Sequence, residues 1–151
     1  MKIIVLAGGL STERDVSLAS AAGICRTLLE KGHDAFLLDV FMGLEHAPEN
    51  LEDVFTLPDH GLDIVKNIST EEPDRNAVKA SRPDQSDCFF GPNVIELCRL
   101  ADITFLGLHG GEGENGKLQA AFDLLGIKYT GPDSLGCAVA MHKGVAKQIP
   151  T

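Results

Sequence analysis

Two glycine-rich segments, each placed between an apolar run and a helical pattern, constrain the fold of this chain most. Residues 8–17 follow the apolar run at 2–7, and residues 109–116 follow the apolar run at 103–108. After each segment, apolar residues recur at three- and four-residue spacings, which predicts an amphipathic helix. Strand, glycine turn and helix in this order form the unit of parallel α/β sheets, whose turns lie at the carboxyl edge of the strands. We therefore expect both segments at the same edge of one sheet.

The rest of the chain continues this alternation. The fold class predicted is α/β with three layers, in which a mostly parallel sheet carries helices on both faces. Residues 41–92 are polar and hold five of the seven prolines, so we expect turns and short strands there, without a catalytic role. The strands expected are 2–7, 34–40, 103–108 and 127–129, and the helices expected are about 13–31, 93–100, 117–125 and a last one from Ser134.

Two of the helix starts carry capping signals. Thr12 and Asp15 have the three-residue spacing of a capping box. Asn93 and Glu96 repeat this spacing directly after Pro92. We therefore expect a side-chain cap at each of these two starts.

The composition excludes several classes of partner. The 151 residues, 44% of them hydrophobic, suffice for one core, and the net charge of −9 is evidence against nucleic-acid and anionic-membrane surfaces, which require clustered Lys and Arg. The apolar start is too short for a signal peptide or a membrane span, so we expect a cytoplasmic protein. The cysteines lack C-x-x-C pairing and are expected to be free thiols rather than disulfides or zinc ligands.

The glycine segments offer room for an anionic ligand. Glycines permit positive φ, and a helix start offers unpaired N–H groups and the positive end of the helix dipole. We expect His109, at the end of a strand, to point into this space. Glu13 has an equally good local explanation, because a carboxylate in the first helical turn stabilises the dipole by about 0.3–1 kcal/mol. Arg14 and Asp15 are expected on a solvated face, and Ser17 lies too deep in the helix for a nucleophile without a neighbouring base.

Three stretches of the chain resemble the signatures of the D-alanine–D-alanine ligases, a family of ATP-grasp enzymes that make the dipeptide for peptidoglycan. Residues 8–18 resemble the first signature, residues 109–119 the second, and residues 126–143 the segment that leads into the nucleotide-binding domain. The matches occur at both ends of the chain in the correct order. Two positions depart from the family pattern, since Asn115 and His142 stand where the family usually has Asp.

The resemblance implies an ATP-dependent ligase that joins two D-alanines through an acyl phosphate. It implies that Glu13 holds the ammonium group of the first D-alanine, that His109 lies by the carboxylate of that substrate, and that Lys143 contacts an ATP phosphate. Of these residues, Glu13 and His109 are the catalytic candidates, and Lys143 is the candidate for cofactor binding. The substrate-binding residues that it implies are Glu13, Val16, Ser17, His109 and Gly110.

The resemblance also implies a division of the protein into domains. Residues 1–141 would form a Rossmann-like, substrate-side domain that precedes an ATP-grasp domain, and residues 142–151 would begin the linker. ATP and Mg²⁺ would be held mainly by domains beyond position 151, since no metal-ligand set is recognisable here. The chain is thus expected to be a fragment that is inactive alone, and its family suggests a homodimer.

Two alternatives stay open at this point. A ligase that joins D-alanine to D-lactate or D-serine would use the same first half of the site. A non-catalytic dinucleotide-binding module would also begin with strand, Gly-Gly and helix. The missing third glycine is evidence against the dinucleotide module, whereas Asp39, near the end of the second strand, is compatible with it.

Overall fold

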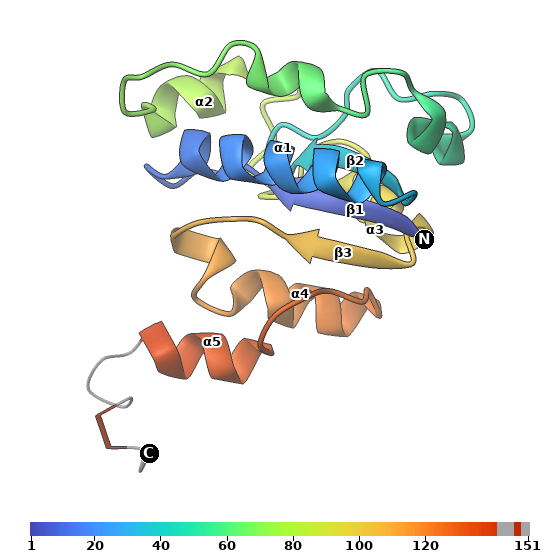
Figure 1. Ribbon diagram of the computed structural model, residues 1–151. Helices are drawn as coiled ribbons and strands as arrows, with labels where there is room; N and C mark the ends of the chain where they lie inside the picture. The colour runs from blue at the N-terminus through green and yellow to red at the C-terminus, as the bar shows by residue number, and fades with distance from the viewer. Residues whose placement is uncertain (142–146, 149–151) are drawn as a thin grey trace.

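A computed structural model describes residues 1–141 and 147–148 of the chain, and Figure 1 shows their arrangement. His142 and Lys143 lie outside the described residues. Strands β1 (Lys2–Ala7), β2 (Asp34–Asp39) and β3 (Ile103–Leu106) form a parallel sheet in the order β2-β1-β3. Because β2 and β3 lie on opposite sides of β1, the turns after β1 and β3 meet at the point where the strand order reverses.

Helix α1 (Arg14–Glu30) covers one face of the sheet. Successive side chains of a strand point to opposite faces, so alternate residues of β1 pack against this helix. The resulting core cluster is apolar throughout and fully or nearly buried. Its buried members are Ile3, Val5, Ala7, Leu18, Ala21, Ala22, Cys25, Ala35 and Leu37.

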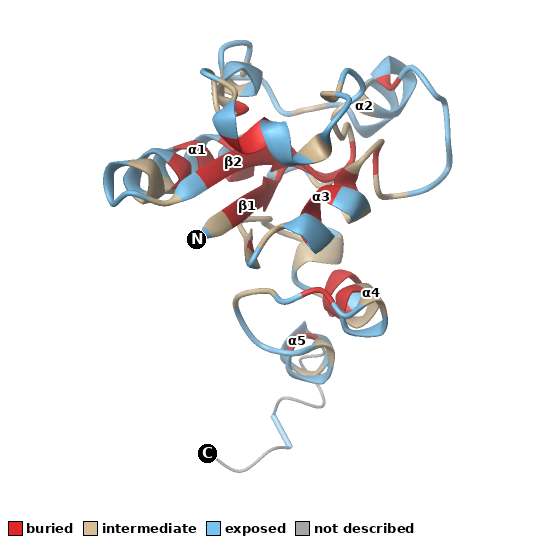
Figure 2. Cartoon of the chain, turned by 90° about the vertical axis from the view of Figure 1, so that its right-hand side faces the viewer, coloured by how far each residue is buried: buried red, intermediate tan, exposed pale blue. Residues whose placement is uncertain are grey.

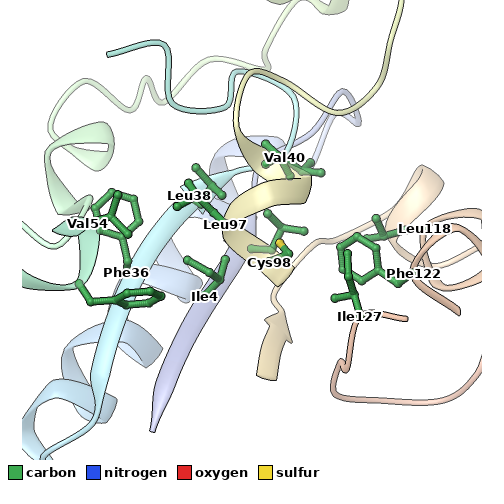
Figure 3. Close-up of a cluster of buried hydrophobic side chains, with 13 residues drawn as sticks. Ile4, Phe36, Leu38, Val40, Val54, Leu97, Cys98, Leu118, Phe122 and Ile127 are labelled. Atoms are coloured by element: carbon green, nitrogen blue, oxygen red, sulfur yellow. The ribbon is translucent and has the colours of Figure 1, made fainter. Parts of the chain in front are cut away.

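The opposite face of the sheet is covered by α3 (Val94–Leu100) and the 3-10 helix η1 (Leu51–Thr56), and its core cluster extends to α4 (Lys117–Leu125). Figure 3 shows this second cluster, in which Ile4 and Phe36 of the sheet lie near Leu97 of α3, while Phe122 lies on α4. In Figure 2, β1 and β2 form the buried centre of the molecule. Helices on both faces of a parallel sheet confirm the predicted three-layer α/β fold.

The predicted fourth strand at 127–129 is reduced to one bridge between Thr104 and Tyr129. The hydroxyl of Thr130 accepts a hydrogen bond from the Leu106 N–H (3.1 Å), so a side chain takes the place of the next backbone acceptor. The ladder beside β3 ends there. The last helix begins as expected and forms α5 (Ser134–Met141), which contacts α4.

Residues 41–92 contain turns, as expected, together with short helices and no strand. Besides η1, they contain the 3-10 helix η2 (Leu62–Val65) and helix α2 (Arg75–Ser81). The Asn50 and Asp74 side chains accept hydrogen bonds from the N–H groups two residues onward, which favours helical turns over strands. Val54 and Phe55 anchor this segment in the core beneath the sheet.

Both capping predictions are wrong. Helix α1 has no side-chain cap, and Ser11, not Thr12, accepts a hydrogen bond from the Glu13 N–H (3.2 Å). Asn93 adopts a left-handed conformation (φ 65°), and its amide donates to the Leu44 carbonyl (2.8 Å). Residue spacing alone misses these contacts because it does not reveal the backbone angles at the helix start.

The four cysteines are free thiols, as expected, and three of them are buried. Burial raises the pKa of the Cys25 thiol to about 11 and that of Cys98 to about 12. Within the described part of the chain, none of the helices combines the length and the apolar character required to span a bilayer.

Candidate functional site

The turns after β1 and β3 converge at the carboxyl edge of the sheet, as the strand order requires. The Ser11 hydroxyl donates a hydrogen bond to the His109 carbonyl (2.6 Å). The Ser17 hydroxyl donates to the Gly107 carbonyl (2.7 Å) and accepts from the Gly8 N–H (3.0 Å). Two glycine segments that are about a hundred positions apart in sequence are thus held together by two serine side chains.

The Glu13 carboxylate belongs to the first turn and lies against the second. A β-carbon placed on Gly110 would lie 3.1 Å from Glu13 Oε2 and 3.2 Å from Ser11 Oγ, so the two turns are in close contact here. Gly110 also has φ +70°, which a side chain disfavours. Glu13 is exposed, and no basic side chain among residues 1–141 pairs with its carboxylate. This free negative charge is available to a cationic group of a ligand.

His109 lies on the second turn, three residues beyond the end of β3, and is half-buried. Its Nε2 is 3.2 Å from the Ser20 hydroxyl of α1. Its carbonyl is held by Ser11, so both its backbone and its ring contact the first turn and the helix that follows. The structure therefore brings His109 and Glu13 to one edge and to adjacent positions of the two turns.

Two other predicted substrate-binding residues have very different surroundings. Val16 is 62% exposed on the first turn of α1, where a ligand can contact it. Ser17 has no exposed surface, and both of its hydroxyl hydrogen bonds join the strand ends. A substrate contact by the Ser17 side chain does not fit this position, because burial and two backbone partners already engage its hydroxyl.

Arg14 does not lie on a solvated face, contrary to expectation. Its side chain is only 13% exposed and forms an ion pair with the buried Asp39, with 2.5 Å between Nη2 and Oδ2. Asp39 also accepts hydrogen bonds from the N–H groups of Phe41 (2.9 Å) and Met42 (3.2 Å). Because Asp39 is buried and both of its carboxylate oxygens already have partners, the structure gives no support for the ribose contact that a dinucleotide-binding module requires.

The register between β1 and β2 indicates where the Asp39 carboxylate lies. Ala7 lies opposite Asp39, so Gly8, the first residue after β1, lies at the sheet edge beside the carboxylate. A β-carbon on Gly8 would lie 2.7 Å from the Asp39 carboxyl carbon. Glycine at this position therefore provides space for an acidic side chain of the neighbouring strand.

A cavity of about 430 Å³ opens beside the two turns. Leu10 of the first turn and Glu112 of the second line it, and Arg75 and Lys79 of α2 contribute positive charge to the opposite wall. Neither Glu13 nor His109 lines this cavity. Residues 41–92, which lack a recognisable motif, thus supply most of a wall next to the site.

The described residues contain no group of three or more His, Cys, Asp or Glu side chains that could hold a metal ion. The buried Asp39 carboxylate is paired with Arg14. The described residues therefore do not fit a Mg²⁺ ion.

The fold and the two converging turns define a class of domain. It is a parallel α/β domain in which the carboxyl edge of the strands forms a candidate ligand site that contains the Glu13 carboxylate and His109. A family profile described as "D-ala D-ala ligase N-terminus" matches residues 2–132. The chain belongs to this family.

Individual relatives agree with the family match. The D-alanine–D-alanine ligase of Lacticaseibacillus casei is 45% identical over 149 residues, which are 99% of this chain and 41% of the relative. The ligase of Pediococcus pentosaceus is 46% identical over 152 residues, with 99% and 42% coverage. The chain thus spans about two fifths of the length of these curated relatives.

A solved structure shares the fold. The crystal structure of D-alanine–D-alanine ligase from Bacillus anthracis complexed with ATP superposes with a TM-score of 0.58 at 21% sequence identity. The superposition covers 98% of this chain and 34% of that one. The superposition therefore covers nearly all of this chain but only about a third of the larger protein.

Proposed function

We propose that this chain supplies the first-substrate side of an ATP-dependent ligase that joins D-alanine to D-alanine. The observation that carries the proposal is the Glu13 carboxylate, which lies against Gly110 where the two turns meet and has no basic partner among residues 1–141. A fixed carboxylate at the edge of a glycine-lined turn suits the ammonium group of a small amino acid. Relatives named D-alanine–D-alanine ligase, 45–46% identical to this chain, support the choice of substrate.

Each exposed residue of the site has a proposed role in holding that substrate. Glu13 accepts hydrogen bonds from the ammonium group, and His109 lies by the carboxylate that reacts. Val16, which is exposed on the first turn of α1, and the backbone of Gly110, which lies against Glu13, are proposed to form the wall beside the small side chain. Ser17 acts behind this wall by holding the turns together.

The proposed reaction proceeds through an acyl phosphate. A carboxylate oxygen of the first D-alanine attacks the terminal phosphorus of ATP, and ADP leaves. The neutral amine of the second D-alanine then attacks the carbonyl carbon, loses a proton, and displaces inorganic phosphate as the amide bond forms. Exclusion of water protects the acyl phosphate from hydrolysis. The chain's own residues orient the first substrate for both steps.

The remaining parts of the proposal rest on the family alone. Lys143, outside the described residues, is proposed to contact an ATP phosphate as a point charge. ATP and Mg²⁺ are proposed to bind mainly to an ATP-grasp domain, after a boundary near residues 141–142. Peptidoglycan synthesis in the cytoplasm and a homodimeric state complete the proposed setting.

A chimera tests the proposal. In this protein, the chain replaces the matching N-terminal segment of the L. casei ligase, and D-alanine-dependent ADP release and dipeptide formation are measured. We expect both activities in the chimera and neither in the 151-residue chain by itself. D-lactate and D-serine, offered as second substrates, distinguish the related ligases. A folded chimera that binds ATP but forms no acyl phosphate with D-alanine would overturn the proposal.

A further inference from the structure

An ion pair between Arg14 and Asp39 lies directly behind the first turn. The two side chains are 13% and 4% exposed, so the pair is largely removed from water. Desolvation offsets much of the attraction within a buried ion pair, and such pairs are therefore weak evidence for stability. A different use of this pair follows from what else its atoms contact.

We infer that Arg14 and Asp39 are positioning residues, which hold the first turn so that the Glu13 carboxylate stays against Gly110. The inference rests on the proposed function, because it concerns the placement of the group that binds the first substrate. Neither side chain contacts that substrate in the proposed arrangement. Both act through the backbone on either side of Glu13.

The guanidinium of Arg14 bridges the helix start and the glycine turn. Its Nη1 donates to the Gly9 carbonyl (2.8 Å), while Nη2 contacts Asp39 Oδ2. A planar guanidinium holds two acceptors in fixed directions, which an ammonium group cannot do. The Arg14 N–H also donates to the Ser11 carbonyl (3.1 Å). Arg14, the residue after Glu13, therefore holds the first turn through both its backbone N–H and its side chain.

Asp39 fixes the other end of this connection. Its Oδ1 accepts from the N–H groups of Phe41 and Met42, so the carboxylate is anchored to the chain that follows β2. Gly8, with φ +79°, leaves the space that the carboxylate occupies. The acidic group therefore has one orientation, in which Oδ2 faces Arg14.

A second arginine extends the connection into residues 41–92. Arg82 is fully buried, and its Nη1 donates to the Phe41 carbonyl (2.9 Å) while its guanidinium stacks on the Phe41 ring (4.4 Å). The Phe41 N–H also donates a hydrogen bond to the Asp39 carboxylate. The middle of the chain thus supports Asp39, which in turn supports Arg14 and the turn that carries Glu13.

The kinetic test uses Arg14→Lys, Arg14→Gln and Asp39→Asn in the chimera. We expect the KM for the first D-alanine to rise about tenfold in Arg14→Gln, with the KM for ATP unchanged. Arg14→Lys keeps the positive charge but loses the planar guanidinium that donates to two acceptors, so the rise in the first KM should be smaller than in Arg14→Gln. The control is Lys66→Ala, which removes an exposed ion pair of similar length (2.7 Å to Asp63) that includes no residue of either glycine turn. This variant should keep the parent's kinetics.

A double-mutant cycle distinguishes positioning from a general loss of stability. If Arg14 acts through Glu13, then Arg14→Gln should change the first KM far less in a Glu13→Gln background than in the parent. Equal fold-changes in the two backgrounds would overturn the inference. So would a lower melting temperature combined with an unchanged first KM, measured well below the transition.

Amide NMR on the 151-residue chain tests the same inference without catalysis. Arg14→Lys should shift the amide resonances of Gly9 and of Gly110, which lies across the site, whereas Lys66→Ala should shift neither. An unmoved Gly110 resonance would contradict the inference. This measurement stays decisive if Asp39→Asn does not fold or if the parent chimera lacks ligase activity, and the latter result would refute only the proposed function.

Discussion

Replacing Ser17 with alanine should separate the two strand ends at the base of the site. The hydroxyl is completely buried and satisfies the Gly8 N–H and the Gly107 carbonyl at 3.0 and 2.7 Å. Alanine leaves both backbone groups without this partner, and the void of one oxygen atom is too small for a water molecule. A buried backbone group without a partner costs about 1–3 kcal/mol. Because Gly107 is only half-buried, we expect Ser17→Ala to lower the free energy of unfolding by about 2–4 kcal/mol.

The size of this loss makes the prediction measurable on the chain alone. For a domain of this length, 1 kcal/mol lowers the melting temperature by about 2–4 °C, so thermal unfolding should shift by roughly 5–15 °C. Urea unfolding should show a lower midpoint with an unchanged slope, because the surface exposed on unfolding stays the same. The control is Ser20→Ala on the same helix, whose exposed hydroxyl contacts only the Ser17 carbonyl and the His109 ring. Its effect should stay within about 0.5 kcal/mol.

A result in which both serine variants unfold at the same temperature would refute the reasoning. It would mean that the Ser17 hydroxyl does not hold the strand ends together. The two turns would then need another contact to explain their convergence, and the hydrogen bond from Ser11 to the His109 carbonyl would be the first to test. Ser11→Ala, alone and combined with Ser17→Ala, would measure that contribution.

Three further predictions concern the exposed groups. Glu13→Gln in the chimera should weaken use of the first D-alanine by about tenfold or more while the KM for ATP stays the same, because only the ammonium contact is lost; unaltered D-alanine kinetics would reject the role. His109→Gln should reduce turnover and move the melting temperature little, since within the described residues the hydrogen bond of its ring is to the exposed Ser20 hydroxyl; normal turnover in a strongly destabilised variant would show a structural role instead. With a thiol reagent at pH 8, the exposed Cys88 should react first, and Cys88→Ser should remove that fast phase. Burial raises the pKa of Cys25 to about 11 and of Cys98 to about 12, so both remain protonated and shielded at this pH; rapid labelling of either would contradict the packing described.

Periodic patterns were enough to predict the central sheet and the helices that flank it. They work for β1 and α1 because both bury one regular face in the core, and burial produces the period. They fail at residues 127–129, where the Thr130 hydroxyl replaces a backbone partner of β3. They also fail in residues 41–92, where single side chains such as Asn50 and Asp74 determine the turns. Contacts made by one atom leave no period in a sequence.

The same distinction applies to the candidate site. The positions of Glu13 and His109 could be expected, since parallel strands bring their following turns to one edge. The Arg14–Asp39 pair could not be found from local patterns, because its partners are 25 residues apart in the sequence. Only the register that places Ala7 opposite Asp39 brings Gly8 beside that carboxylate. Sheet register, once known, therefore indicates a contact that residue spacing does not.

A family signature combines two kinds of residue that the structure separates. Within residues 8–18, Glu13 and Val16 are exposed, whereas Gly8, Ser17 and Leu18 are buried. The buried members contact strands and backbone, and they would be required for the shape of the turn with any ligand. The exposed members alone can contact a substrate. A substitution at Ser17 should therefore affect folding before it affects substrate choice, and substrate specificity should be altered first at Glu13 and Val16.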